Sequence, residues 1–417
     1  MRKVQRTEKT WAMAAVVVGG LIAATLFHLF VGRVLGHGYP DNTFLYDPNQ
    51  RFSDFYEIFG PVQQGSPLSG EKSVYFPFAY APLFALVALS WPAALTVVVL
   101  AFAAGMFGFY WRTLDFLTGW RRALAAFAIP FLSLPVIGCI DRGNIELIIV
   151  MYVLAFWTLF ARGRYLWSAV PLAAAIATKI YPGALGILLL LRRQYAAAAL
   201  CAVLTGVLTL VASAVYPGGI AGTLDLMHLR LEYLNKTYIL NPTAHYGSSN
   251  YLSLVKLFLR LPGLGFAPHA QAIIFAYSVA SALILVAVAA YVILRERVVW
   301  KQVYLLVFTT IVLPQVSFDY KLMHLLLPVA LFLAAPPGRR RDDLLYILLI
   351  GFVLVPKKYF PLGSDTTIGV LLNPLALTIV AAHIMWSGLF RRSAGEPQTG
   401  NRVSASDRDQ GHVAAAA

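Results

Sequence analysis

Long apolar stretches, separated by short clusters of arginine and lysine, run through almost the whole of this 417-residue chain. Apolar stretches of about 20 residues cross a lipid bilayer as helices. Hydropathy places them at residues 11–32, 76–111, 123–140, 144–161, 166–191, 195–216, 270–294, 300–314, 321–336, 343–356 and 366–390. Only 12% of the residues are charged, against about 25% in soluble domains. The pattern predicts an all-α polytopic membrane protein, a bundle of transmembrane helices.

The basic residues indicate how the chain is threaded. The formal net charge is +14, and the excess lies at short turns, as it does in cytoplasmic loops of membrane proteins. The clusters are Arg2/Lys3/Arg6/Lys9, Arg112/Arg121/Arg122, Arg162/Arg164, Arg192/Arg193, Arg295/Arg297/Lys301, Arg339/Arg340/Arg341 and Arg391/Arg392. Basic and aromatic residues do not interleave into a patch, so we expect no nucleic-acid partner.

Threading both ends inside divides the chain into three parts. Residues 1–10 form a cytoplasmic N-terminus before an uncleaved signal anchor, and residues 11–392 form one membrane domain. Two large loops, 33–75 and 217–268, then lie outside. The second is expected to carry a short interfacial helix, with Lys256 and Arg260 as headgroup anchors. The polar residues 393–417 are predicted to be a disordered cytoplasmic tail.

Two apolar stretches have lengths that do not suit one straight helix. Residues 166–191 lie between two basic turns that both belong inside, yet are too few for two full crossings. We expect a hairpin of two half-spanning helices broken at 178–182, because Pro182 cannot donate an amide hydrogen. Residues 76–111 are expected to break at Trp91 and Pro92. The total is about twelve crossings or half-crossings.

In this topology the ionisable residues that lie outside the cytoplasmic turns gather at the outer face. Charge near a bilayer is costly and marks a functional hypothesis. These residues are Asp54, Glu57, Asp141, Arg142, Lys179, His245, Asp319, Lys321, His324, Lys357 and Lys358. They divide into carboxylates that can accept a proton and cations that can hold phosphate, which suits transfer from a phosphate-linked lipid to a hydroxyl group. The alternative is that they are interfacial anchors and ion pairs.

Several other classes of site lack support in the sequence. No His/Asp/Glu cluster has the spacing of zinc ligands, so no metal is expected. There is no serine elbow or phosphate-binding P-loop. Cys139 and Cys201 lie in apolar runs and predict no disulfide framework.

A set of short segments, in order, carries a resemblance. The segments are Ser53-Asp54-Phe55, Phe76-Pro77-Phe78-Ala79-Tyr80-Ala81-Pro82-Leu83, Arg142-Gly143-Asn144-Ile145-Glu146-Leu147, Ala177-Thr178-Lys179-Ile180-Tyr181-Pro182 before Arg192-Arg193, and His324 after Ser317-Phe318-Asp319-Tyr320-Lys321. Together they resemble glycosyltransferase family 87, the bacterial polyprenyl-phosphate-sugar-dependent mannosyl- and arabinosyltransferases of the GT-C superfamily. Tyr80-Ala81-Pro82 departs from the family's commoner Tyr-Pro-Pro.

This resemblance implies a GT-C-like fold and an inverting sugar transfer. Asp54 is expected to act as the catalytic base on an acceptor hydroxyl, which attacks the anomeric carbon and expels polyprenyl phosphate. Mannose is the first choice of sugar and arabinose the second, with a lipid-linked or glycan acceptor. The expected setting is the extracytoplasmic face of a bacterial inner membrane, with a monomer among membrane lipids and without cofactor or metal.

The remaining candidates are expected to bind substrate or phosphate. They are Lys179, His324, Arg142, Glu57, Tyr80, Tyr181, Asn144, Asp319, Lys321 and His245, with Asn250 as a further acceptor contact. Simpler roles stay open for some of them: Arg142 could pair with Asp141, and Asp319 with Lys321. Glu57 could be a solvated surface residue, and the two tyrosines could belong to an interfacial aromatic belt.

Two rival functions also remain open. A transporter or flippase of lipid-linked sugars would have similar hydropathy and would need no base. A polymerase or ligase of lipid-linked glycans would also use large outer loops. Asp54 separates transfer from transport, because only transfer requires a proton acceptor.

Overall fold

The computed structural model describes residues 2–39, 41–45, 48–67, 75–241, 249–259, 267–357 and 367–390. Within these ranges the regular structure is helical, with no strand. The α-helices are α1 (Arg2–Arg33), α2 (Ser53–Gln63), α3 (Trp91–Thr113), α4 (Gly119–Phe131), α5 (Leu134–Arg142), α6 (Glu146–Ala161), α7 (Tyr165–Thr178), α8 (Ile187–Leu191), α9 (Tyr195–Val215), α10 (Gly219–Leu234), α11 (Tyr251–Phe258), α12 (Ala270–Leu294), α13 (Val299–Val312), α14 (Leu326–Ala334), α15 (Arg340–Leu354) and α16 (Gly369–Phe390). Short 3₁₀ or π turns are η1 (Pro48–Gln50), η2 (Pro77–Leu86), η3 (Tyr181–Gly186), η4 (Asn235–Ile239), η5 (Ala267–His269) and η6 (Asp319–Leu325).

Five of the described helices are long and apolar enough to cross a membrane, namely α1, α3, α9, α12 and α16. A sixth span is counted if α4 and α5 are taken together. The expected total of about twelve crossings or half-crossings is therefore not confirmed. Shorter apolar helices account for several of the other stretches, among them α6, α7 and α13.

The hairpin expected over residues 166–191 is present. Helix α7 stops before Lys179, whose backbone is extended (φ −151°, ψ 137°), and η3 resumes with Pro182 in its first turn. The returning arm of the hairpin packs Gly183 against Ile176 of α7. The break expected at Trp91 is also confirmed, since η2 ends at Leu86 and α3 begins at Trp91.

Two elements differ from expectation. The stretch 123–140 splits into α4 and α5, which are bent by 61° with respect to each other. Pro135 lies in the first turn of α5, where proline is tolerated because that amide has no partner in the helix. The loop expected over 217–268 contains the 16-residue helix α10.

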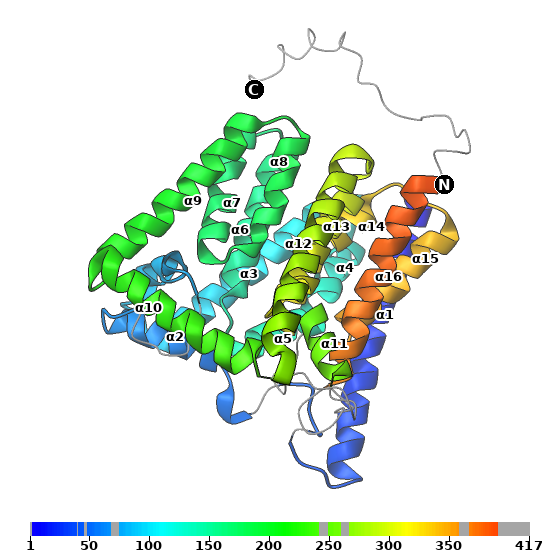
Figure 1. The fold of residues 1–417 in the computed structure, drawn as a ribbon. Helices are drawn as coiled ribbons and strands as arrows, with labels where there is room; N and C mark the ends of the chain where they lie inside the picture. Colours follow the sequence, from blue (N-terminus) through cyan, green and yellow to red (C-terminus); the bar gives the residue numbers. More distant parts are fainter. Residues whose placement is uncertain are drawn as a thin grey trace.

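Helix α13 forms the centre of the bundle and is buried along almost its whole length. It contacts α12, α14, α16, η3 and η6. Helices α6, α7 and α9 pack in sequence on one flank, and α1, α15 and α16 pack together on the other (Figure 1). Helices α2, α5, α10 and α11 lie at one end of the bundle, opposite the turn that joins α8 to α9 (Figure 1).

The outer helices display apolar side chains on the surface. Helix α12 exposes Phe275, Leu283 and Val286, and α9 exposes Val203 and Val215. A contiguous apolar surface of this kind is unfavourable in water and is typical of contact with lipid. The exposed faces therefore agree with the lengths of these two helices in indicating membrane spans.

Candidate functional site

The start of α2 is fixed on the junction between α5 and α6. The backbone amide of Phe52 donates to the carbonyl oxygen of Asp141 (2.9 Å), and Phe52 adopts a left-handed conformation (φ 59°). Gly143 ends α5, also with positive φ (63°). A Cβ at Gly143 would lie 2.8 Å from the Cβ of Phe55 and 3.3 Å from the Cα of Phe52. Only glycine lets the two segments approach this closely.

This docking directs Asp54 toward two hydrogen-bond donors from the α5–α6 junction. Asp54 Oδ1 accepts from Nη2 of Arg142, and Oδ2 accepts from Nδ2 of Asn144 at 2.7 Å. Arg142 also donates to the side-chain oxygen of Gln50 (3.3 Å). The Asp54 side chain remains 15% exposed. The carboxylate is thus oriented by both oxygens but still reachable from outside.

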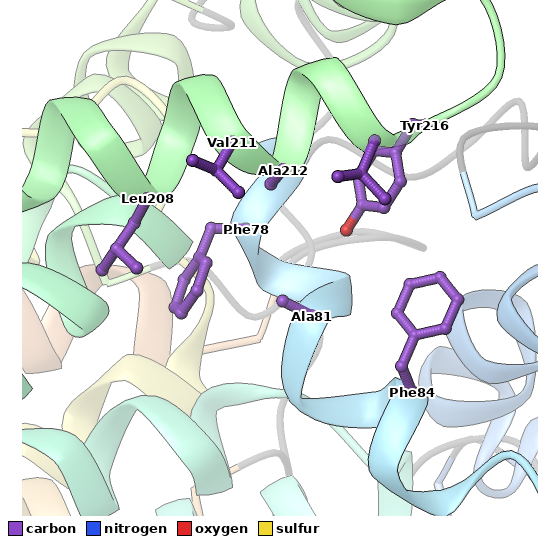
Figure 2. Close-up of a pocket in the computed structure, with 8 residues that line it drawn as sticks. Phe78, Ala81, Phe84, Leu208, Val211, Ala212 and Tyr216 are labelled. Carbon is purple, nitrogen blue, oxygen red and sulfur yellow. The ribbon is translucent and has the colours of Figure 1, made fainter.

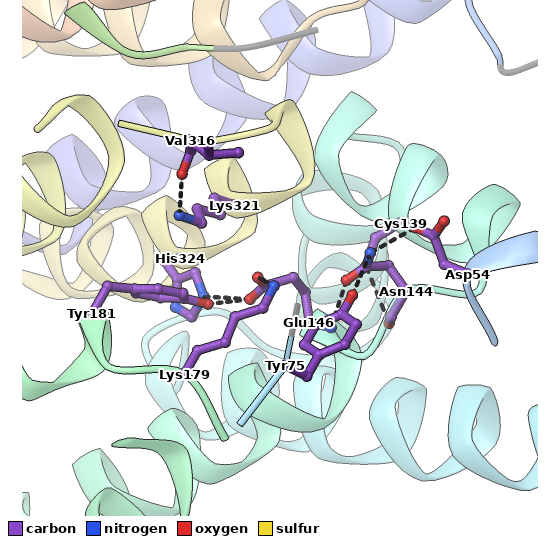
Figure 3. Close-up of polar contacts among 10 residues, drawn as sticks. All are labelled: Asp54, Tyr75, Cys139, Asn144, Glu146, Lys179, Tyr181, Val316, Lys321 and His324. Atoms are coloured by element: carbon purple, nitrogen blue, oxygen red, sulfur yellow. Dashed lines mark hydrogen bonds and ion pairs between the residues drawn. The ribbon is translucent and has the colours of Figure 1, made fainter. Parts of the chain in front are cut away.

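Asn144 connects Asp54 to a second cluster (Figure 3). Its side-chain oxygen accepts from the backbone amide of Glu146 (3.0 Å), and its amide nitrogen donates to the Tyr75 hydroxyl (3.2 Å). Burial, and then the carboxylates of Asp54 and Glu146, raise the pKa of Tyr75 well above 10.0. Tyr75 is therefore a neutral hydroxyl between the two carboxylates.

Glu146 is the centre of the second cluster. It is fully buried at the start of α6, with 0% of its side chain exposed. Its Oε1 accepts from Lys179 Nζ at 2.6 Å, and its Oε2 accepts from the Tyr181 hydroxyl and lies 3.2 Å from Nε2 of His324. A buried carboxylate is stable only with such partners.

The backbone breaks bring these partners to Glu146. Lys179 and Tyr181 lie at the interruption between α7 and η3, where the chain leaves the helical path. Lys321 and His324 are three residues apart in η6, and residues at this spacing lie on the same face of a 3₁₀ turn. Irregular backbone in a membrane protein is tolerated where it lines a protein-buried site.

The second cluster has more cationic than anionic groups. Lys321 Nζ donates to the carbonyl oxygen of Val316 (3.0 Å) and lies 4.6 Å from the ring centre of Tyr181. Lys179 Nζ lies 4.6 Å from the ring centre of Tyr75. Two lysines and a histidine thus surround one carboxylate. The arrangement is suited to binding a further anionic group, such as a phosphate.

A match to known proteins decides the family. The model of glycosyltransferase family 87 matches residues 74–314, more than half of the chain. The chain belongs to glycosyltransferase family 87. It is a membrane glycosyltransferase. No curated protein matches the sequence significantly.

Within this family 87 glycosyltransferase, the match covers part of the site. Tyr75, Arg142, Asn144 and Glu146 lie inside the matched residues, as does the break that carries Lys179. Asp54 precedes the match, and η6 with Lys321 and His324 follows it. The three parts come together only through the fold.

Several predicted site residues have surroundings of their own, outside the Asp54–Glu146 network. Tyr80 is fully buried and its hydroxyl accepts from Arg230 Nη1 (3.0 Å), so its ring has no free face for a sugar. Glu57 lies exposed on α2, one turn beyond Asp54. Asp319 accepts from the Ser249 hydroxyl. His245 lies outside the described residues.

The expected ion pairs and anchors also change. Arg142 pairs with Asp54, whereas Asp141 faces Arg51 at 3.9 Å, so the structure favours neither residue as the partner of the other, an alternative that the sequence left open. Lys256 is buried rather than at a headgroup surface, and its ammonium donates to the carbonyl oxygens of residues 238 and 241. Asn250, proposed as an acceptor contact, is buried and its side chain caps α11 through the amide of Ser253 (3.0 Å).

Glu146 and Tyr75 were not among the site residues predicted from the sequence. Glu146 lies within the family-like segment 142–147, and a carboxylate at the start of an otherwise apolar helix was a sufficient signal. Tyr75 carried no comparable signal, because aromatic residues are common near membrane surfaces. Among the described residues, no group of three or more His, Cys, Asp or Glu side chains could hold a metal ion.

An apolar groove lies between η2 and the C-terminal half of α9 (Figure 2), and none of its lining residues belongs to the Asp54–Glu146 network. Its lining includes Phe78, Ala81, Phe84, Val211 and Tyr216. The Tyr216 hydroxyl donates to the carbonyl oxygen of Pro77 (2.8 Å) and so is not free to bind a polar ligand. The groove offers a surface for a hydrocarbon chain rather than for a sugar.

Proposed function

We propose that this glycosyltransferase moves a monosaccharide from a polyprenyl-phosphate donor to an acceptor hydroxyl, with inversion at the anomeric carbon. One observation carries the proposal: Asn144 joins an oriented, accessible carboxylate, Asp54, to a cluster with excess positive charge around Glu146. A base and an anion-binding site are the two parts that transfer from a sugar phosphate requires.

In the proposed reaction, Asp54 takes the proton of the acceptor hydroxyl as its oxygen attacks the anomeric carbon. The bond from that carbon to the phosphate oxygen breaks, and its electron pair leaves with polyprenyl phosphate. Lys179, Lys321 and His324 offset the negative charge that gathers on the leaving phosphate. This chemistry calls for no metal or cofactor, because cations of the protein bind the phosphate.

A lipid donor is supported by the apolar groove between η2 and α9. The groove could receive a prenyl chain, and one of its walls is α9, a helix long and apolar enough to span a membrane. Mannose is proposed as the sugar, with arabinose second, and a lipid-linked or glycan hydroxyl as the acceptor. These choices rest on the resemblance of the motifs.

The proposed setting is the extracytoplasmic face of a bacterial inner membrane, with a GT-C-type arrangement and a monomeric chain. The start of α2 lies at the end of the bundle opposite the turn between α8 and α9 (Figure 1). That turn contains Arg192 and Arg193, which favour the cytoplasmic side. Family membership favours transfer over a transporter or flippase, and over a glycan polymerase or ligase.

A donor panel tests the proposal. Purified full-length protein is incubated with polyprenyl-phosphate mannose, arabinose and glucose and with a lipid extract as acceptor, and the lipid products are analysed by mass spectrometry. We expect a product heavier by one sugar residue, of opposite anomeric configuration to the donor. Transfer only from nucleotide sugars, or a product with retained configuration, would contradict the proposal.

Filling the groove is expected to weaken the use of long-chain donors. Val211→Trp adds a large side chain to the groove lining on an exposed position of α9. The KM for a long-chain polyprenyl donor should rise about fivefold to tenfold, since lost apolar contact of about 1 kcal/mol corresponds to that factor. The KM for a short-chain analogue should not change.

Val207→Trp is the matched control. Val207 lies one turn earlier on α9, is also exposed, and does not line the groove. Its substitution should leave both KM values unchanged. Equal effects of the two substitutions, or equal effects on long and short donors, would place the prenyl chain elsewhere.

A further inference from the structure

We propose that Glu146 is a positioning residue that holds Lys179, Tyr181 and His324 ready for the donor phosphate. The inference rests on the proposed function, because it gives Glu146 a task in binding the donor. Glu146 is not expected to contact the substrate itself and would act through its three partners.

Burial places Glu146 behind its partners. Its side chain is 0% exposed, whereas the Lys179 side chain is 16% exposed. Figure 3 shows Lys179, Tyr181 and His324 converging on the Glu146 carboxylate from two segments of the chain, the α7–η3 break and η6. A phosphate that approaches from the exposed side would meet Lys179 before Glu146. The carboxylate is therefore a support for the cations rather than a contact of the donor.

Electrostatics explains why such a support is needed. The Lys179 ammonium lies 4.6 Å from the centre of the Tyr75 ring, and the Lys321 ammonium lies 4.6 Å from the centre of the Tyr181 ring. Like charges in a low-dielectric site repel and would move apart in the absence of an anion. Glu146 supplies that anion before the donor binds, through the 2.6 Å contact with Lys179.

Glu146 also orients the ring of His324. An ionised carboxylate only accepts hydrogen bonds, and its Oε2 lies 3.2 Å from Nε2 of His324. The Tyr181 hydroxyl donates to the same oxygen. Nε2 also lies 3.0 Å from the Tyr181 hydroxyl oxygen, so a hydrogen on Nε2 suits both of its neighbours, and the ring lies against Tyr181 with its plane nearly perpendicular (82°). One carboxylate thus sets the orientation of three donors.

The test compares substitutions of Glu146 in the full-length protein. Glu146→Gln keeps the shape and removes the charge, and should weaken binding of polyprenyl phosphate, the reaction product, by about tenfold. The donor KM should rise by a similar factor, whereas kcat should change by less. Glu146→Asp keeps the charge on a shorter side chain, so its binding should lie between that of Glu146→Gln and that of the unaltered protein.

A double-mutant cycle separates positioning from general stability. If Glu146 acts partly through Lys179, Glu146→Gln should raise donor KM by a smaller factor in the presence of Lys179→Met than in the unaltered protein. If the factors by which the two substitutions raise donor KM simply multiply in the double variant, the two residues act independently and the inference is overturned. Glu232→Gln is the control, because Glu232 of α10 also bonds a lysine, Lys236 of η4 at 2.7 Å, but both side chains are exposed. It should leave binding unchanged.

The outcomes distinguish the inference from the proposed function. If the unaltered protein binds and uses polyprenyl-phosphate sugars but Glu146→Gln binds polyprenyl phosphate equally well, the positioning role is overturned and the proposed function stands. If the unaltered protein does not bind polyprenyl phosphate, both are overturned. If Glu146→Gln fails to fold, Glu146→Asp decides: a donor KM equal to that of the unaltered protein overturns the positioning role.

Discussion

Asp54→Asn is expected to lower the rate of sugar transfer by about 10²- to 10⁴-fold, the usual contribution of a general base. The asparagine amide has nearly the same shape as the carboxylate, but it does not take a proton from the acceptor hydroxyl. Its oxygen can still accept a hydrogen bond from Arg142 or Asn144, the donors that orient Asp54. The local structure should therefore survive while the chemistry is lost.

Initial rates of product formation, followed by mass spectrometry, measure the loss. Binding of polyprenyl phosphate, measured in parallel, should change little, since the cations of the second cluster are untouched. Asp225→Asn, on the exposed surface of α10, is the control and should retain full activity. Substantial transfer by a folded Asp54→Asn protein would rule out Asp54 as the base.

Most of the clustered residues could be named from the sequence because charges are rare in such an apolar chain. Asp54, Arg142, Asn144, Lys179 and His324 each stand out near the end of an apolar stretch. The structure joins them into one network, with Glu146 and Tyr75 added. Their roles in catalysis remain proposals, but their proximity is a finding.

The hydrogen-bond partner of each residue was harder to predict than which residues belong to the cluster. The sequence left open a pair of Arg142 with Asp141 and a pair of Asp319 with Lys321, which are neighbours in the chain. In the fold Arg142 turns to Asp54, 88 residues away, and Lys321 donates to Val316. Local sequence favours adjacent partners, whereas the packing of α2 on the α5–α6 junction decides the real one. That packing depends on tertiary contacts that no single segment contains.

Some of the helix breaks could be predicted from the sequence and others could not. Proline marked the interruptions near Trp91 and Pro182, because it lacks the amide that a helix interior needs. The bend between α4 and α5 was missed, since the apolar stretch 123–140 reads as one span by hydropathy. Helix α10 was missed because its apolar residues are interrupted by charged ones, among them Asp225 and Arg230.

Gly143→Ala is expected to reduce transfer on the order of 10²-fold, the effect of displacing a catalytic group by about 1 Å. Alanine at φ 63° is strained by about 1–2 kcal/mol. Its Cβ would also stand 2.8 Å from the Cβ of Phe55 and 3.3 Å from the Cα of Phe52. These residues flank Asp54 in the chain, so α2 has to move away from the junction and carry the carboxylate off its donors.

The control for this change lies on the same helix. Gly138 is inside α5, where an added Cβ would have nothing within 4 Å, and Gly138→Ala should keep activity and add about 0.5–1 kcal/mol of helix stability. Gly143→Ala should reduce transfer far more than it reduces binding of polyprenyl phosphate. Lys179 and His324 lie on segments other than α2, and their contacts with Glu146 do not depend on the position of α2. Equal losses of both, or normal transfer, would mean that the close approach of α2 to Gly143 does not set the position of Asp54.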